Sequence, residues 1–254
     1  MGTMIFNGVS TVDQGVFIQT PPVYEFPSKK YETIQIDGKN GDLVIDKDSY
    51  SNVVREYNLA SEIKNGESFV TKAKNIAGWL SSAKGYARLE DTYEPDYFRL
   101  AMFRTGGQLL NFYDKATAIV VRFECKPQRF LKSGEIEQHI LETDLGNFIE
   151  IINPEDYISE PLLTIEGDMV NAEFYSGETF ETKELKTSFE SDLGAEYIMD
   201  SDIQECYTKI PAAYVNSSIT MSNGFPKLYP GKNWIKVTSA AFVKFSIKPR
   251  WWVL

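Results

Sequence analysis

Several side chains in this sequence are of types that carry out chemistry, and their spacing decides whether they can act together. Acidic residues come in close pairs, and a glycosidase needs two carboxylates at a set separation across a cleft. With 36 acidic side chains, however, such pairs arise by chance and indicate a solvated acidic surface. The pairs are Glu90 with Asp91, Glu94 with Asp96, and Asp200 with Asp202.

The residues that build metal or nucleophile sites are scarce. His139 is the one histidine in the sequence, so a multi-histidine zinc site is excluded, and its neighbour Glu142 completes no catalytic motif. Cys125 and Cys206 are typical of reduced core thiols rather than of a disulfide framework. Gly106 and Gly107 form an isolated turn signal rather than a nucleotide loop. We therefore expect no catalytic residue, no metal and no cofactor, and a protein that is not an enzyme.

Charge is distributed in three zones along the 254 residues. Residues 1–133 carry a net charge of +1, residues 134–205 carry −18, and residues 206–254 carry +7. The total of −10 argues against binding to a nucleic-acid backbone, which needs clusters of Lys and Arg. No apolar run approaches the ~18 residues that span a bilayer, and the first residues do not form a signal peptide. We expect synthesis in a cytoplasm and no membrane insertion.

The elements that must position these residues are mainly strands. The stretch 118–126 alternates strictly, so that Ile119, Val121, Phe123 and Cys125 face one way, and Pro127 is expected to end it. Residues 53–59 and 96–104 read as further strands. Residues 31–52 predict a strand, a turn and a second strand, because Gly38 and Gly41 bracket Asn40 in a strong turn signal.

One helix is predicted over the sequence SFVTKAKNIAGWLSS, beginning at residue 68. Its apolar stripe is formed by Val70, Ala73, Ile76, Ala77 and Leu80, and Trp79 is expected to pack the helix on a sheet.

The second part of the chain contains many short strands separated by turn residues, which favours an antiparallel sandwich or barrel. The fold class is therefore mainly β. We expect two domains, 1–133 and 134–254, with the last strand packed either in the sandwich or back on the first domain. The expected short strands are 136–141, 148–152, 161–166, 171–175, 179–185, 195–199, 205–209, 217–221, 233–238 and 241–248.

A series of motifs along nearly the whole chain resembles the siphophage distal tail protein (Dit) family. The first block is YETIQIDGKNGDLVIDKDSYSN, from Tyr31 to Asn52. The next residues of the pattern are Ile76, Trp79, Leu80, Gly85, Tyr86, Arg88, Leu89, Asp91, Pro95, Tyr97, Phe98, Arg122, Phe123, Cys125, Lys126 and Pro127. The later ones are Asn153, Pro154, Pro161, Leu162, Leu163, Ile165, Gly167, Tyr197 to Asp202, Leu228, Pro230, Gly231, Asn233, Ile235 and Ile247 to Trp252, with Pro249, Arg250 and Trp251 among them. Asp202 stands where Glu is usual in the family.

This resemblance implies a structural phage protein. In the family, the N-terminal part forms a homohexameric ring at the distal tail tip or baseplate of the virion, and the second part is a galectin-like β-sandwich. The ring connects the major tail (tube) protein to the tail-associated lysin or fibre hub and to receptor-binding proteins. DNA passes through the ring without stable binding, which is compatible with a near-neutral first zone.

The N-terminal arm is the predicted subunit interface. Pro21, Pro22 and Pro27 exclude a long regular element there, so we expect an extended arm or short edge strands. An apolar arm either lies across the neighbouring subunit, as we hypothesise, or packs on its own domain. Its candidate contact residues are Phe6, Val16, Phe17, Ile18, Val23, Tyr24 and Phe26.

An alternative function is binding of a host cell-wall saccharide. Exposed aromatic side chains on a galectin-like sandwich could stack on sugar rings. The single histidine lies outside any galactose-reading cluster of the kind that the true galectins have, which weakens this alternative.

Overall fold

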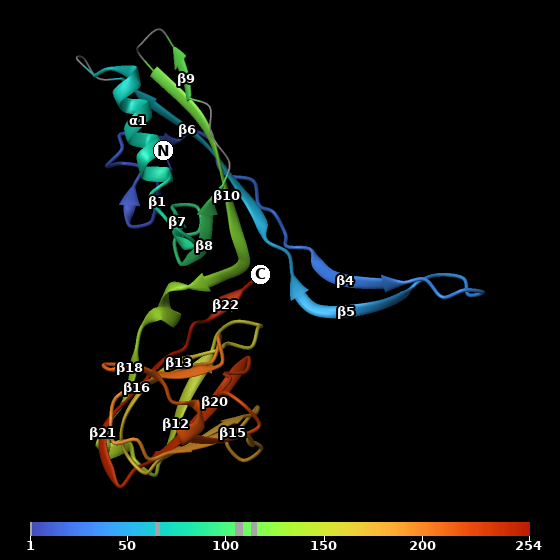
Figure 1. The fold of residues 1–254 in the computed structure, drawn as a ribbon, viewed down its shortest axis with the longest axis vertical. Coiled ribbons are helices and arrows are strands. Elements are labelled where there is room, and N and C mark those ends of the chain that lie inside the picture. Colours follow the sequence, from blue (N-terminus) through green and yellow to red (C-terminus); the bar gives the residue numbers. More distant parts are fainter. Residues whose placement is uncertain (1, 64–66, 105–108, 113–115) are drawn as a thin grey trace. The chain divides into compact units, whose positions relative to one another are not determined.

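The computed structural model describes residues 2–63, 67–104, 109–112 and 116–254. The described chain divides into two compact units, one formed by Met1–Arg129 with Leu254 and the other by Phe130–Val253 (Figure 1). The sequence predicts the boundary after residue 133, which is a few residues beyond the observed boundary after Arg129. The turn signal at Gly106 and Gly107 lies outside the described residues.

The first unit is built on an antiparallel sheet, called here the N-terminal sheet. Its strand order is β2-β1-β7-β8-β10-β6-β3, and β9 and β22 also pair with β10. The strands of this sheet that begin in the first unit are β1 (Met4–Phe6), β2 (Val9–Ser10), β3 (Phe17–Ile18), β6 (Val53–Glu62), β7 (Ala87–Asp91), β8 (Tyr97–Phe103), β9 (Leu109–Phe112) and β10 (Ala116–Leu131). Strand β22 (Trp252–Val253) and the last two residues of β10 belong to the second unit.

Strand β10 confirms the predicted alternation, because Ile119, Val121, Phe123 and Cys125 are all buried. Its expected end at Pro127 is wrong, since β10 continues to Leu131. The register with β6 stops at Cys125, so the missing N–H of Pro127 breaks no hydrogen bond of that ladder.

Helix α1 (Phe69–Leu80) packs on this unit's core and is the only α-helix in the described residues. Its buried positions are Lys72, Ile76, Trp79 and Leu80, whereas Val70 is 71% exposed. The inward face is therefore rotated from the predicted stripe. The Lys72 side chain can be buried on this face because its ammonium group reaches the backbone oxygen of Gly15 at 3.4 Å.

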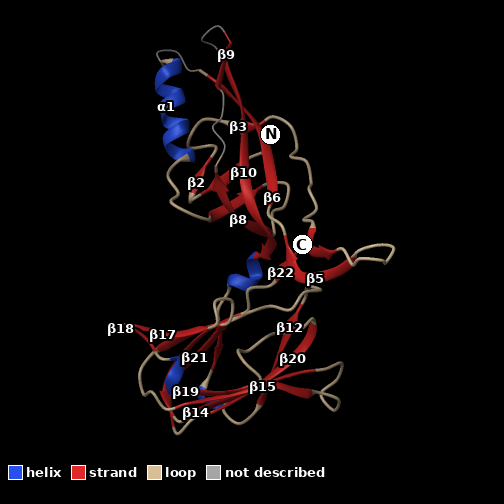
Figure 2. Ribbon diagram, turned by 45° about the vertical axis from the view of Figure 1, so that its right-hand side comes forward, coloured by secondary structure: helices blue, strands red, loops and turns tan. Residues whose placement is uncertain are grey.

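The second unit is a sandwich of two antiparallel sheets (Figure 2). The front sheet has the order β11-β21-β13-β16-β17-β18, and the back sheet has the order β12-β20-β14-β15-β19. The front strands are β11 (Gln138–Ile140), β13 (Leu162–Asp168), β16 (Tyr197–Asp200), β17 (Glu205–Lys209), β18 (Ala212–Tyr214) and β21 (Ala241–Lys248). The back strands are β12 (Phe148–Asn153), β14 (Val170–Ser176), β15 (Glu184–Ser191), β19 (Ile219–Ser222) and β20 (Gly231–Thr238).

The core of this unit lies between its two sheets. Leu163 and Phe245 of the front sheet and Phe174 and Ile235 of the back sheet are at most 1% exposed. The rings of Phe189 and Phe245 stack across the interior with centroids 6.4 Å apart. Most of the predicted short strands are present, but the strand expected over 179–185 is wrong because β15 begins at Glu184.

The predicted fold class is confirmed: the chain is mainly β, with a helix in the first unit and an antiparallel sandwich in the second. Within the described residues, no helix is both long and apolar enough to cross a membrane.

Candidate assembly surface

The hairpin of β4 (Lys29–Ile34) and β5 (Leu43–Tyr50) is exposed over most of its residues and forms a sheet of its own (Figure 1). Thr33 pairs with Val44 and Ile34 with Leu43, so Ile34, Leu43 and Ile45 lie on one face. These three side chains are 41%, 48% and 39% exposed. An isolated hairpin is marginally stable in water. This apolar face, called here the hairpin face, is therefore suited to packing against another surface.

The hairpin is shaped by its turn and by exposed ion pairs. Gly38 and Gly41 have φ values of 78° and 83°, a conformation that favours glycine, and Asn40 lies between them in the loop. Lys29 pairs with Asp46, and Lys47 pairs with Glu32. The hydrogen bond from Lys29 lowers the pKa of Asp46. Because these pairs face solvent, each contributes little to the stability of the hairpin.

The chain reaches the hairpin through residues 19–28, called here the proline segment. The guanidinium group of Arg55 donates a hydrogen bond to the backbone oxygen of Val23 at 3.1 Å. The side chain of Glu25 accepts a hydrogen bond from the backbone N–H of Val54 at 3.2 Å. The Tyr24 ring lies 4.9 Å from the guanidinium carbon of Arg129. The segment is thus fixed to β6 although it has no regular structure of its own.

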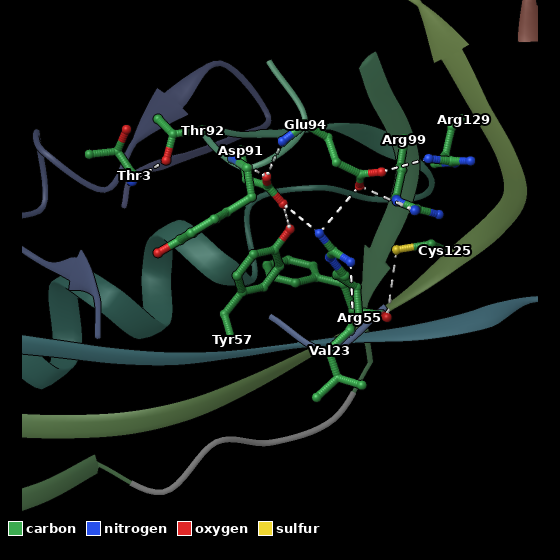
Figure 3. A network of polar contacts seen from close by, with 12 residues as sticks. Thr3, Val23, Arg55, Tyr57, Asp91, Thr92, Glu94, Arg99, Cys125 and Arg129 are labelled. Atoms are coloured by element: carbon green, nitrogen blue, oxygen red, sulfur yellow. Dashed lines mark hydrogen bonds and ion pairs between the residues drawn. The ribbon is translucent and has the colours of Figure 1, made fainter. Parts of the chain in front are cut away.

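A buried polar network provides these attachments (Figure 3). The carboxylate of Glu94 accepts hydrogen bonds from Arg55 at 3.2 Å, Arg99 at 3.3 Å and Arg129 at 2.8 Å. Asp91 accepts from Arg55 at 3.1 Å and from the hydroxyl group of Tyr57 at 2.6 Å. Because these charges are buried, removing one partner would leave the other charge uncompensated and would destabilise the fold.

The network is suited to holding structure and not to proton transfer. Burial, with Asp91 as the next largest cause, raises the pKa of Tyr57 well above its ordinary value, so the hydroxyl group stays protonated. Burial also raises the pKa of the nearby Cys125 thiol to about 12. At neutral pH both groups are neutral hydrogen-bonding or packing groups.

The predicted arm residues divide into two sets. Phe6, Val16 and Ile18 are at most 3% exposed and belong to the core of their own unit, and Phe17 on β3 is half-buried. The reason is that β1 pairs with β7 and β3 pairs with β6, which turns alternate side chains inward. Phe6, Val16 and Ile18 therefore pack on their own unit, which is the second of the two possibilities that the sequence left open. The exposed members are Val23 at 71%, Tyr24 at 39% and Phe26 at 82%.

The other predicted packing residues occupy defined places. Trp79 is 5% exposed, and its indole N–H donates to the backbone oxygen of Phe6 at 3.2 Å, which joins α1 to β1. In the second unit, the backbone oxygen of Pro249 accepts a hydrogen bond from the Ser159 hydroxyl group. Arg250 contacts both carboxylate oxygens of Asp200, at 2.6 and 3.1 Å, and Trp251 is 3% exposed in the sandwich core.

The residues first considered for chemistry do not gather at one place in the described structure. His139 is exposed on β11. Glu94 and Asp91 belong to the arginine network, and Asp200 is paired with Arg250. In the described part of the chain, no cluster of three or more His, Cys, Asp or Glu side chains could hold a metal ion.

Sequence reasoning did not find the arginine network or the exposure of the hairpin face. A signal for the network was present, because Arg55 lies between Val53 and Tyr57 on the inward positions of β6. A cation at an inward strand position predicts a buried partner. The exposure of the hairpin has no comparable signal, since apolar residues in a strand ordinarily predict burial.

The sequence matches no protein-family model and no curated protein. Among solved structures, the chain is similar to the SPP1 Dit (gp 19.1) protein, which is described as a paradigm of the hub adsorption apparatus in phages that infect Gram-positive bacteria. The TM-score is 0.63 with 12% sequence identity, and the match covers 97% of each chain.

The chain has a Dit-like fold. Because the match with Dit covers both units, the resemblance inferred from the ordered motifs is confirmed for the fold. At this identity the likeness extends to backbone architecture and not to individual contact residues.

Proposed function

We propose that this chain is a structural protein of a phage tail, a homohexameric ring at the distal tip or baseplate of the virion. The ring connects the tail tube protein to the tail-associated lysin or fibre hub and to receptor-binding proteins. The observation that carries the proposal is the likeness to SPP1 Dit over 97% of both chains. The function is that of an adaptor, with no catalytic step assigned to any residue.

The hairpin face supports self-assembly. A ring needs a heterologous interface, in which an element of one subunit fits a different surface of the next. Ile34, Leu43 and Ile45 form such an element, because they are exposed on a hairpin that makes a two-stranded sheet by itself. Val23 and Phe26 add exposed apolar area at the base of the hairpin. Together they form the proposed interface.

The charge distribution is compatible with the proposed passage of DNA. Residues 1–133 carry a net charge of only +1, so a lumen built from this part would not retain phosphates through counterion release. The acidic zone of residues 134–205 would steer a partner that has a basic face. The rate of association with such a partner should then fall as salt is added.

Light scattering on the purified chain, over a concentration and salt series, tests the ring. The expected mass is six subunits or a monomer-to-hexamer equilibrium. The double variant Ile34→Lys/Leu43→Lys should stay monomeric with an unchanged denaturation midpoint. Val12→Lys is the control, because Val12 is 65% exposed in the same unit but lies outside the hairpin. A wild-type chain that stays monomeric at high concentration, or a double variant that still assembles, contradicts the proposal.

A further inference from the structure

An aromatic box on the second unit encloses a cation. The ammonium group of Lys183 lies 3.3 Å from the ring centroid of Phe180, 4.5 Å from that of Phe148 and 6.0 Å from that of Tyr175. The Phe148 ring is inclined by 74° to Tyr175 and by 82° to Phe180. Rings set at nearly right angles enclose a volume instead of stacking, so the cation contacts several rings at once.

The back sheet and one turn bring the box together. Phe148 on β12 pairs with Lys236 on β20, and Tyr175 on β14 pairs with Trp234 on the same strand. Their side chains therefore lie on one face of the sheet. Phe180 comes from the turn that joins β14 to β15, and its ring lies 6.1 Å from that of the buried Trp234.

The turn is held firmly in place. The backbone N–H of Thr179 donates to the Thr182 hydroxyl oxygen at 3.2 Å, and that of Thr182 donates to the Thr179 hydroxyl oxygen at 3.3 Å. A Cβ atom at Gly177 would lie 2.9 Å from the Cα atom of Lys183, so glycine permits the close approach of the two chain segments. The box is thus preformed rather than assembled by chance contacts of long side chains.

The sequence segment that supplies three walls of the box is mainly acidic, although the ammonium group of Lys236 on β20 also lies 5.6 Å from the Phe148 ring centroid. Lys183 and Lys186 are the only basic residues between 134 and 205, where 20 side chains are acidic. The carboxylate of Glu173 accepts a hydrogen bond from the Tyr175 hydroxyl group at 2.9 Å, which places a negative charge beside the box. Lys183 itself donates one hydrogen bond, to the backbone oxygen of Phe180 at 2.9 Å. The rings and not hydrogen-bond acceptors supply most of the box.

We propose that this box is a binding site for a trimethylammonium group, and that Lys183 occupies it as an internal competitor. A quaternary ammonium is weakly hydrated and needs no hydrogen-bond acceptor, so it suits an aromatic box beside an acidic surface better than a primary ammonium does. The proposal is independent of ring formation, because all residues that carry it lie within the second unit.

The presence of Lys183 in the box determines how much its removal should raise the affinity for choline. A tethered group acts at an effective concentration in the millimolar range or above, which lowers the apparent affinity of a free ligand for the same place. Removing the Lys183 side chain should therefore tighten the binding of choline by about tenfold or more. Removing Phe180, a wall of the box that is 44% exposed, should abolish binding without unfolding the unit.

The experiment is a titration of the full chain with choline chloride, followed by NMR, against sodium chloride at equal ionic strength. Wild type should show weak, saturable shifts that Phe180→Ala removes. Lys183→Ala should bind at least about tenfold more tightly, and Lys183→Ala/Phe180→Ala should not bind. Lys186→Ala is the matched control, because its ammonium group lies 5.5 Å from the Tyr229 ring outside the box, and it should behave as wild type.

Two outcomes would overturn the proposal: Lys183→Ala binding choline no more tightly than wild type, or Phe180→Ala binding it as well as the parent chain. A second arm uses vesicles of phosphatidylcholine and the Lys183→Ala variant. Retention on the vesicles assigns the group to a lipid, whereas choline binding without retention assigns it to a soluble or polymer-bound source.

Discussion

Arg55 donates a hydrogen bond to the backbone oxygen of Val23 at 3.1 Å and thereby fixes the proline segment to a residue 32 positions later in the chain. The same guanidinium group is held by Asp91 and Glu94. The base of the exposed hairpin is therefore attached to buried ions. Its attachment depends on their partners remaining charged.

Replacing Glu94 with Gln should destabilise the first unit by about 3–5 kcal/mol, because it leaves buried arginines without their shared counter-ion. Urea denaturation measures the loss. The matched control is Glu56→Gln, since Glu56 pairs with Arg122, whose side chain is 52% exposed. That change should cost less than about 1 kcal/mol. Equal losses of stability in the two variants would show that the buried network contributes no more to stability than an exposed ion pair.

Phe6 and Phe26 belong to the same apolar arm, but truncation of Phe6 should destabilise the chain far more than truncation of Phe26. Phe6→Ala should cost about 3–5 kcal/mol, because Phe6 is 0% exposed and its ring centroid lies 4.7 Å from that of Phe123. Phe26→Ala should change stability by no more than about 0.5 kcal/mol, since Phe26 is 82% exposed. Denaturation curves of both variants measure the two effects. If Phe6→Ala left stability unchanged, Phe6 would not be a core residue of its own unit, and the arm would again be a candidate contact with a neighbouring subunit.

Strand β10, helix α1 and Phe6 show which parts of the fold the sequence pattern predicts and which parts it does not. The strict alternation along β10 predicts its buried face correctly, because each inward side chain has the same surroundings. In α1, Val70 and Lys72 exchange the places that polarity predicts, because the helix can bury a lysine stem whose ammonium group finds the Gly15 oxygen. For Phe6, the pattern could not say which surface would cover it, since pairing of β1 with β7 is a long-range choice.

Gly134→Ala should destabilise the second unit by about 1–3 kcal/mol. A Cβ atom there would lie 2.4 Å from the backbone nitrogen of Trp251, so the two chain segments must separate. Gly78→Ala provides the contrast, because a Cβ atom on this helical residue meets nothing within 4 Å. That change should stabilise the chain by about 0.5–1 kcal/mol. Thermal or urea denaturation of both variants shows whether each change lowers or raises the stability of the chain.

Both cysteines should be unreactive in the folded chain. Burial raises the pKa of Cys125 and of Cys206 to about 12, so almost no thiolate is present at pH 8. A thiol reagent such as DTNB should modify neither residue in the native state and both in denaturant. Rapid modification of the native chain would show that a thiol is accessible and ionised.

Glu160 should make the second unit less stable as pH rises. Burial, and after it Asp202, raises the pKa of Glu160 above its ordinary value of 4.5. The folded state then holds this proton more tightly than the unfolded state, so stability falls as pH rises from 4.5 through the folded pKa. Glu160→Gln should raise the denaturation midpoint at pH 7 relative to wild type. The advantage should vanish near pH 4, and a constant difference across this range would refute the assignment.

The chain enters and leaves the second unit through two segments that are hydrogen-bonded to each other. The backbone N–H of Leu131 donates to the oxygen of Trp251, and that of Arg250 donates to the oxygen of Gly134, each at 2.8 Å. A unit whose two ends lie side by side can be exchanged for another of similar end spacing without rethreading the rest of the chain. The architecture thus permits modular replacement: recombination at these paired segments could supply a new outer domain and leave the first unit's sequence intact.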